Sequence, residues 1–531
     1  MSGRRAHWGW GYEDEQATVA QMREAAPGMA AYLGMGSADI EEPVPLERVA
    51  LAPPRVEVPA GLADIADVSV HARASHAMGK AYRDIVRGFR GRFDNPPDVV
   101  LRPRDERDVE RALEWAAGAD VAVVPYGGDT SVVGGVECPA GRFAGVATLD
   151  LGALDRVLEV DEVSRAARIQ AGAAGPVLEE QLGAQGWTMR FYPQSFELAT
   201  LGGWIATRAG GHFATLWTHI DDLVESVRAV TPDQGVWQSR RLPGSGAGVS
   251  PDRMLLGSEG TLGVITEAWV RVQPRPPHRA GRGITFPTFV AGAEAVRALS
   301  QSGLHPANCR LIDAGEAKLT GAGDGSGTLL VLGLESTDPD GAGLVADGLA
   351  RGLAICAEHG GTWDEPAGGR GGDAVGAWRS AFLRAPYLRD TFVAMGVLSE
   401  TFETAITWDA FPAFHSAVTG AVEEALGGEG RVSCRFTHVY PDGPAPYFTV
   451  LAPARRGGEV EQWQAIKQAA GDAIIAGGGT ITHHHAVGRD HRPWYDRQRP
   501  EAFAAALTGA KAAVDRRGLL NPGVLIDPAA A

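Results

Sequence analysis

The clearest pattern of apolar and polar positions in the chain begins near Asp94. A short apolar run, VVL, is followed by ERDVERALEWAA with apolar residues at helical spacing, and then by a second apolar run, VAVV, which ends in a glycine loop. This order predicts a strand, an amphipathic helix from about Glu106 to Ala117, and a strand from Val121 to Val124. Strands that alternate with helices are typical of α/β and α+β domains.

Two changes in composition divide the rest of the chain. The first ninety residues mix helical patches with a Pro-rich passage, EEPVPLERVALAPPRVEVPAG, which is expected to be an extended connector. A second break follows VRVQPRPPHRAGR, and 531 residues are too many for one hydrophobic core. We predict a helical and extended arm at 1–92, domains at 93–276 and 277–475, and a C-terminal segment at 476–531 that packs back on the active site.

Charge and cysteine content narrow the class of protein. There are 65 acidic and 49 basic residues, and the net charge of −16 argues against general nucleic-acid binding. The four cysteines are scattered without CxxC pairs, which indicates a reducing compartment. Neither a long apolar run nor an N-terminal h-region occurs, so we expect a cytoplasmic protein. A peripheral contact at the inner membrane surface stays an open alternative.

Three glycine-bearing segments are candidates for a cofactor site. They are PYGGDTS after the predicted strand, YPQSFELATLGGWIATRAGG, and DRMLLGSEGTLGVITEAWV. Glycine lets backbone N–H groups approach a phosphate closely. The first segment is neither GxGxxG nor a P-loop, so a dinucleotide-binding Rossmann site and an NTPase are both unsupported. Each segment taken singly is equally compatible with an ordinary turn.

Three consecutive histidines, His483, His484 and His485, stand in GGGTITHHHAVG, far from either end of the chain. Imidazole exchanges protons near neutral pH, so the cluster indicates proton transfer or metal binding. A strand is expected here, and its alternation would place His483 and His485 on one face and His484 on the other. A structural cluster of histidines remains the competing interpretation.

Taken together, these segments resemble the flavin-binding domain of the vanillyl-alcohol oxidase superfamily. The segments WGWGYEDE, CRLIDAGE, YLRD, SETFETAITWD, CRFTHVYPDGPAPYF and GGGTITHHHAVG are further similar to the alkylglycerone-phosphate synthase (alkyldihydroxyacetonephosphate synthase) family of ether-lipid synthesis. The resemblance implies an α+β fold: a PCMH-type FAD-binding domain of two subdomains, an α+β cap that binds substrate, and an N-terminal helical arm. It also implies FAD, a small-molecule or lipid substrate, and a homodimer.

The resemblance also implies roles for individual residues. The implied FAD contacts are Pro125, Gly127, Gly128, Asp129, Thr130, Ser131, Ser195, Thr200, Gly202, Gly203, Thr207, Arg208, Gly257, Glu259, Gly260, Gly263 and Ile265. Arg310 and Arg389 would hold the anionic end of the substrate, since a guanidinium suits a phosphate or carboxylate. Tyr447 and the three histidines would be catalytic, and no residue is assigned to a metal ion.

The implied reaction replaces the acyl group of acylglycerone phosphate by a long-chain alcohol without net redox change. It requires a base and an acid near the carbon beside the ketone. Three positions depart from the family pattern: Asp129 and Ala486 replace glycines, and Phe191 replaces a histidine. The glycine loop carries no attachment histidine, so FAD is expected to be noncovalent.

Two other functions remain open from the sequence. One is an FAD-dependent dehydrogenase or oxidase of a D-2-hydroxy acid or another alcohol, in which Arg310 or Arg389 grips a carboxylate. The other is a nonenzymatic protein that binds flavin or, through the histidine triplet, a metal ion.

Overall fold

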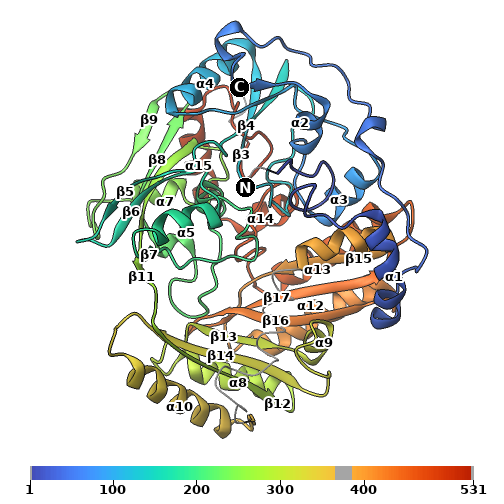
Figure 1. Cartoon of the computed structure of the whole chain (residues 1–531), viewed down its shortest axis with the longest axis vertical. Helices are drawn as coiled ribbons and strands as arrows, with labels where there is room; N and C mark the ends of the chain where they lie inside the picture. Colours follow the sequence, from blue (N-terminus) through green and yellow to red (C-terminus); the bar gives the residue numbers. More distant parts are fainter. Residues whose placement is uncertain (1–2, 365–384, 528–531) are drawn as a thin grey trace.

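The computed structural model describes residues 3–364 and 385–527. Figure 1 shows two parts, one above the other: the blue to green elements, apart from the first helix, lie in the upper part, and a broad sheet of yellow and orange strands with its helices forms the lower part. Within these residues the sheets have four, five, two and six strands.

The first sheet contains the segment in which the periodicity was clearest. Its order is β1-β2-β4-β3, with parallel pairing of β2 and β3 to β4. The strands are β1 (Ala66–Asp67), β2 (Val99–Leu101), β3 (Val121–Tyr126) and β4 (Gly145–Asp150), and the helices nearby in the chain are α2 (Val70–Ser75), α3 (Tyr82–Phe89) and α4 (Glu106–Ala119). The predicted helix is confirmed and is two residues longer, because Asp105 caps its start and Asp120 ends it in the left-handed region.

The second sheet is wholly antiparallel, in the order β5-β6-β10-β8-β9. Its strands are β5 (Val157–Asp161), β6 (Ala166–Gln170), β8 (Val224–Thr231), β9 (Gly235–Gln238) and β10 (Val264–Arg271); α5 (Gly175–Gly183), α6 (Leu201–Thr207) and α7 (Pro251–Leu255) accompany it, and β7 (Trp187–Thr188) pairs with β11 (Gln273–Pro274). Leu201 and Ile205 on α6 pack with Ile169 and Ile265 of the sheet in one core.

The six-stranded sheet forms the centre of the lower part (Figure 1). In the order β12-β14-β13-β16-β17-β15, its strands are β12 (His278–Phe286), β14 (Thr328–Ser336), β13 (Asn308–Ile312), β16 (Arg431–Val439), β17 (Pro444–Pro453) and β15 (Val397–Glu403). Its helices are α8 (Phe289–Ser300), α9 (Ala314–Leu319), α10 (Ala342–Glu358), α12 (Phe411–Leu426) and α13 (Glu459–Ala476). Alternation gives this sheet an apolar face, on which Phe402, Phe436 and Phe448 pack under α8, α10, α12 and α13.

The N-terminal helix packs on the lower part, and the C-terminal segment passes from the lower part back to the upper part. Helix α1 (Val19–Leu33) packs on the edge of the six-stranded sheet, where Leu33 contacts the cluster of Val397 and Leu451 (Figure 1). The C-terminal helices α14 (Arg492–Gln498) and α15 (Glu501–Val514) return to the upper part, and Leu520 forms a bridge with Val123 of β3.

The structure bears on two further expectations from the sequence. Cys138, Cys309, Cys356 and Cys434 are all buried free thiols. No helix in the described part of the chain is long and apolar enough to cross a membrane.

Lys511 fastens the C-terminal segment to the upper part. Its buried ammonium donates to the carbonyls of Thr261 (2.7 Å) and Leu520 (2.8 Å) and pairs with Asp515 at 2.6 Å. Lys511→Met should therefore lower the free energy of unfolding by about 3 to 5 kcal/mol, because it leaves a buried carboxylate without its cation. Urea denaturation measures this, with the exposed Lys318→Met as control; equal stability of the two variants would contradict the assignment.

Candidate active site

A cavity of about 580 Å³ lies where α1, the glycine loop after β3 and the six-stranded sheet meet. A smaller cavity of about 100 Å³ continues it. Five predicted FAD contacts line both cavities: Gly127, Ser131, Thr200, Gly203 and Thr207. These come from two of the three glycine-bearing segments, so the fold brings those segments to one place.

Fifteen of the seventeen predicted FAD contacts line these cavities. The larger cavity adds Gly128, Asp129, Thr130 and Ser195 to the shared five, and the smaller adds Pro125, Gly202, Glu259, Gly260, Gly263 and Ile265. Arg208 and Gly257 line neither cavity. Arg208 instead pairs with Asp221 at 2.8 Å, and a Cβ on Gly257 would lie 2.7 Å from its side chain, so these two residues pack against each other.

The glycine loop needs its unusual composition for steric reasons. A Cβ on Gly128 would lie 2.1 Å from the carbonyl oxygen of Leu198, so no other residue fits there. Asp129 has a φ of 62°, in the left-handed region that favours glycine. Its carboxylate is buried and pairs with the buried Lys80 ammonium at 2.9 Å. The Lys80 ammonium thus neutralises the aspartate that stands where the family pattern has glycine. The sequence did not reveal this partner.

The N-terminal arm supports the same loop. The Arg5 guanidinium donates to the carbonyl oxygens of Gly128 at 3.0 Å and Gly127 at 3.3 Å. The arm thereby holds two carbonyl groups of the loop.

The opposite wall is the polar face of the six-stranded sheet. Arg435 on β16, Tyr447 on β17 and Glu403 on β15 are direct cross-strand neighbours, so their side chains share one face. The Arg435 guanidinium lies 3.7 Å from the centre of the Tyr447 ring, and it also pairs with Glu316. Arg435 and Glu403 stand inside segments singled out in the sequence, but no local signal assigns them a role.

The buried Glu403 carboxylate organises the histidine segment. It accepts the Thr482 hydroxyl at 2.6 Å and the consecutive backbone N–H groups of His483, His484 and His485 at 2.6, 3.1 and 2.9 Å. Burial opposes its ionisation, yet the neighbouring histidines and these hydrogen bonds hold the pKa of Glu403 at about 2.

The predicted strand at the histidines is wrong. Residues 481–487 form no strand, because their N–H groups converge on Glu403 instead of pairing with a neighbouring strand. His484 and His485 consequently both line the cavity, and His483 turns to the Tyr440 hydroxyl at 2.7 Å. The predicted pairing of His483 with His485 on one face is therefore also wrong.

A second buried glutamate, Glu259 in the third glycine-bearing segment, also binds the backbone of the histidine segment. Glu259 accepts the N–H groups of Val487 at 2.9 Å and Gly488 at 2.7 Å. Burial raises the pKa of Glu259 to about 7. Between the two glutamates, Ala486 has a φ of 74°, which explains why the family pattern has glycine there. Phe191, the other departure, is a core residue packed on Trp204 and lines neither cavity.

Two buried arginines make the cavity wall positive. Arg310 on β13 and Arg435 both line it, and burial, together with the charge of Arg435, lowers the pKa of Arg310 to about 9, which leaves it protonated at neutral pH. Arg389 also lines the cavity and donates to the Lys80 carbonyl at 2.9 Å. Asp313 and Asp390, the carboxylates nearest in sequence, bind backbone N–H groups of Glu316 and Trp10.

Comparison with known proteins shows similarity to FAD-dependent enzymes over most of the chain. Family models match residues 97–238 (FAD binding domain) and 275–525 (FAD linked oxidases, C-terminal domain). Alkyldihydroxyacetonephosphate synthase of Trypanosoma brucei brucei is 31% identical over 496 residues, covering 86% of this chain and 78% of the relative. A solved alkyldihydroxyacetonephosphate synthase matches with a TM-score of 0.80 at 24% identity, over 98% of both chains. A solved structure of p-cresol methylhydroxylase with substrate bound matches with a TM-score of 0.69 at 13% identity, over 96% of this chain and 98% of the other. The predicted α+β, PCMH-type fold and the FAD cofactor are confirmed.

The described residues fit FAD. The joined cavities are bordered by backbone of three glycine-bearing segments, and the two carboxylates on their walls, Asp129 and Glu259, are occupied by Lys80 and by two N–H groups. Both carboxylates thus have partners, so neither presents an uncompensated negative charge to a phosphate.

Lys80 should prove necessary for FAD binding because it neutralises Asp129. Lys80→Met leaves that carboxylate unpaired beside the phosphate-binding loop, and FAD affinity should fall by roughly two orders of magnitude, as expected for about 3 kcal/mol. Asp129→Gly added to Lys80→Met removes the charge and restores a residue suited to a positive φ, so the double variant should recover FAD.

Flavin absorbance per chain after gel filtration is the measurement. A single variant with full FAD, or a double variant as empty as the single one, would refute this role for the ion pair.

Proposed function

The chain belongs to the alkyldihydroxyacetonephosphate synthase family, and from this premise we propose that it exchanges the acyl group of an acylglycerone phosphate for a long-chain alcohol, with FAD as cofactor. The observation that carries the proposal is the composition of the larger cavity. One continuous space borders the FAD loops, buried arginines, a phenol with two imidazoles, and an apolar wall.

The arginines suit the phosphate of the substrate. Arg310 and Arg435 are both buried, so an anion between them restores charge balance in a region of low dielectric. Arg435 already pairs with Glu316, and Arg310 donates to the His212 carbonyl at 3.3 Å. We assign the phosphate to Arg310, the residue that the family resemblance implies for the anionic end of the substrate, with Arg435 and Arg389 as neighbours that raise the local potential.

The apolar wall suits a long alkyl or acyl chain. It is made by one hydrophobic cluster at the junction of α1 with the six-stranded sheet, whose cavity-lining members are Met29, Leu33, Leu319, Phe392 and Leu451. Burial of alkyl carbons against such a surface is favourable by about 0.8 kcal/mol for each methylene. A small 2-hydroxy acid, the substrate of the alternative oxidoreductase, makes no use of this wall.

Tyr447 and His485 are assigned to the proton chemistry. Burial raises the pKa of Tyr447, so its hydroxyl stays protonated and can donate. Burial lowers the pKa of His485, so its imidazole is neutral and can accept the proton beside the ketone. Glu403 lies 3.7 Å from His485 Nδ1, where its charge stabilises the imidazolium that forms. FAD, when bound, would supply an electron-accepting ring for the reaction.

Removing either proton-transfer group should slow turnover while sparing the fold. Tyr447→Phe and His485→Gln should each lower the rate by roughly 10²-fold or more, because a positioned acid or base typically contributes that much. Exchange of the substrate hydrogen beside the ketone with deuterated water, followed by mass spectrometry, reports the step directly. Tyr495→Phe, which changes a tyrosine of the core outside both cavities, is the control.

Unchanged exchange and turnover in both variants with FAD still bound would remove these residues from the mechanism. Anaerobic bleaching of the flavin by a 2-hydroxy acid, with a ketone product, would instead support the oxidoreductase.

Arg310 should determine affinity for the phosphate. Loss of one charge-assisted hydrogen bond costs about 1.5 to 3 kcal/mol, so Arg310→Ala should raise the apparent KM for acylglycerone phosphate by roughly 10- to 100-fold. Affinity for the alcohol should not change, since the chain binds elsewhere in the cavity. Steady-state kinetics against both substrates tests this, with the half-buried Arg297→Ala on α8, outside both cavities, as control. Equal effects on both substrates would argue for general damage.

A homodimer and a peripheral membrane contact stay predictions, as does noncovalent attachment of FAD.

A further inference from the structure

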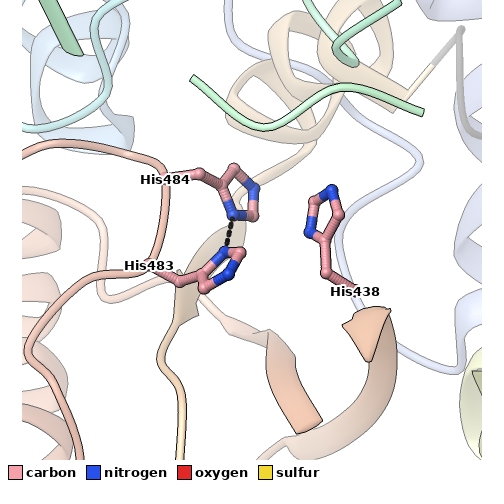
Figure 2. A group of neighbouring side chains, drawn as sticks. All are labelled: His438, His483 and His484. Atoms are coloured by element: carbon pink, nitrogen blue, oxygen red, sulfur yellow. Dashed lines mark hydrogen bonds between the residues drawn. The ribbon is translucent and has the colours of Figure 1, made fainter. Parts of the chain in front are cut away.

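Four imidazoles from three distant parts of the chain meet beside the catalytic pair. His219 Nε2 lies 3.1 Å from His483 Nε2, and His483 Nδ1 lies 2.9 Å from His484 Nδ1. His438 completes the group, and one ligand atom each of His438, His483 and His484 falls within 4.8 Å of the others. Figure 2 shows the three rings around a common centre, with His438 facing the other two.

Hydrogen bonds to carbonyl oxygens determine which ring nitrogens carry lone pairs. His438 Nε2 lies 3.0 Å from the Gly211 carbonyl oxygen, which can only accept, so this nitrogen carries the hydrogen. His438 Nδ1 therefore has a lone pair; it is buried, and it has no hydrogen-bond partner among the described residues. The same logic applies to His219, whose Nδ1 lies 2.9 Å from the Arg208 carbonyl oxygen and whose Nε2 faces His483.

This arrangement is the one in which proteins present imidazole to metal ions. A ligating histidine usually donates its second N–H to a carbonyl or carboxylate, which orients the ring and directs the lone pair at the ion. The buried Glu403 carboxylate lies 3.4 Å from His484 Nδ1 and supplies negative charge against a cation. The positive charges of Arg310 and Arg435 disfavour a cation near His484, and the carboxylate of Glu316 partly offsets them.

We propose that His438, His483 and His484 bind one divalent transition-metal ion of the zinc class. With metal–nitrogen bonds of about 2 Å, ligand nitrogens lie about 3 to 4 Å apart. A small rotation of the His483 or His484 ring therefore completes the site and exchanges their mutual hydrogen bond for two bonds to the ion. His438 and His484 line the larger cavity, so the remaining coordination position is open to water or a substrate oxygen.

The site is separate from the proton-transfer pair. His484 holds the ion, and His485 keeps a free imidazole next to Tyr447 at a ring distance of 5.5 Å. The proposal goes beyond the proposed function, because metal binding can be measured without turnover and does not depend on which substrate the enzyme uses.

The test uses FAD-loaded protein produced without a histidine tag. The protein is treated with a chelator, incubated with Zn²⁺ or Co²⁺ and passed through gel filtration; metal per chain is then measured by mass spectrometry. Wild type should retain one ion per chain, and the Co²⁺ form should show a tetrahedral absorption band at longer wavelength than the flavin bands. His438→Gln and His483→Gln should each weaken binding by about 100-fold or more, because each removes one of three protein ligands.

His485→Gln is the matched control, since it changes the adjacent histidine outside the ligand set and should keep the ion. The flavin spectrum of each variant shows whether the fold survives. Wild-type protein with less than about a tenth of an ion per chain, or equal loss in the control, would overturn the proposal and leave the four imidazoles as a hydrogen-bonded network.

Discussion

The geometry of the site depends on the burial of one carboxylate. An ionised Glu403 inside the protein is tolerated only if its oxygens are saturated by donors, and three consecutive backbone N–H groups and one hydroxyl meet that demand. Because these N–H groups must all point at Glu403, the backbone conformation of the histidine segment is fixed. Glu259, in the upper part of the molecule, likewise accepts the backbone N–H groups of Val487 and Gly488. The histidine segment is therefore held at the junction of the two parts.

Backbone anchoring leaves the imidazoles free for chemistry. Because Glu403 is satisfied by N–H groups, each histidine side chain can take a different direction. His485 lies beside Tyr447, whereas His483 and His484 turn toward His438 and His219. A regular strand would have alternated these side chains between two faces and could not have placed neighbouring imidazoles in separate roles.

Charges around the cavity are arranged in local pairs of opposite sign. Lys80 neutralises Asp129 on the FAD side, and Arg435 pairs with Glu316 on the substrate side. These pairs reduce the unbalanced charge at the glycine loop and on the wall formed by the six-stranded sheet. The hydrophobic cluster at α1 then completes a cavity that is charged in one region and apolar in another.

The sequence alone determined the features that arise from local physics and from motif resemblance. Helical periodicity predicted α4, an apolar run predicted β3, and glycines marked the loops that border the cavities. Arg310, Arg389, Tyr447, His484 and His485, all predicted site residues, line one cavity, and their roles stay predictions.

Only the tertiary structure decided the contacts between distant residues. Lys80 meets Asp129, Glu403 meets the histidines about eighty positions later, and His219 meets His483 across 264 positions. No periodicity encodes such pairs, because they depend on how sheets and loops from separate parts of the chain pack. For the same reason the histidine segment was wrongly predicted as a strand: its local propensity is extended, but the demand of a buried carboxylate for backbone donors is stronger than that propensity.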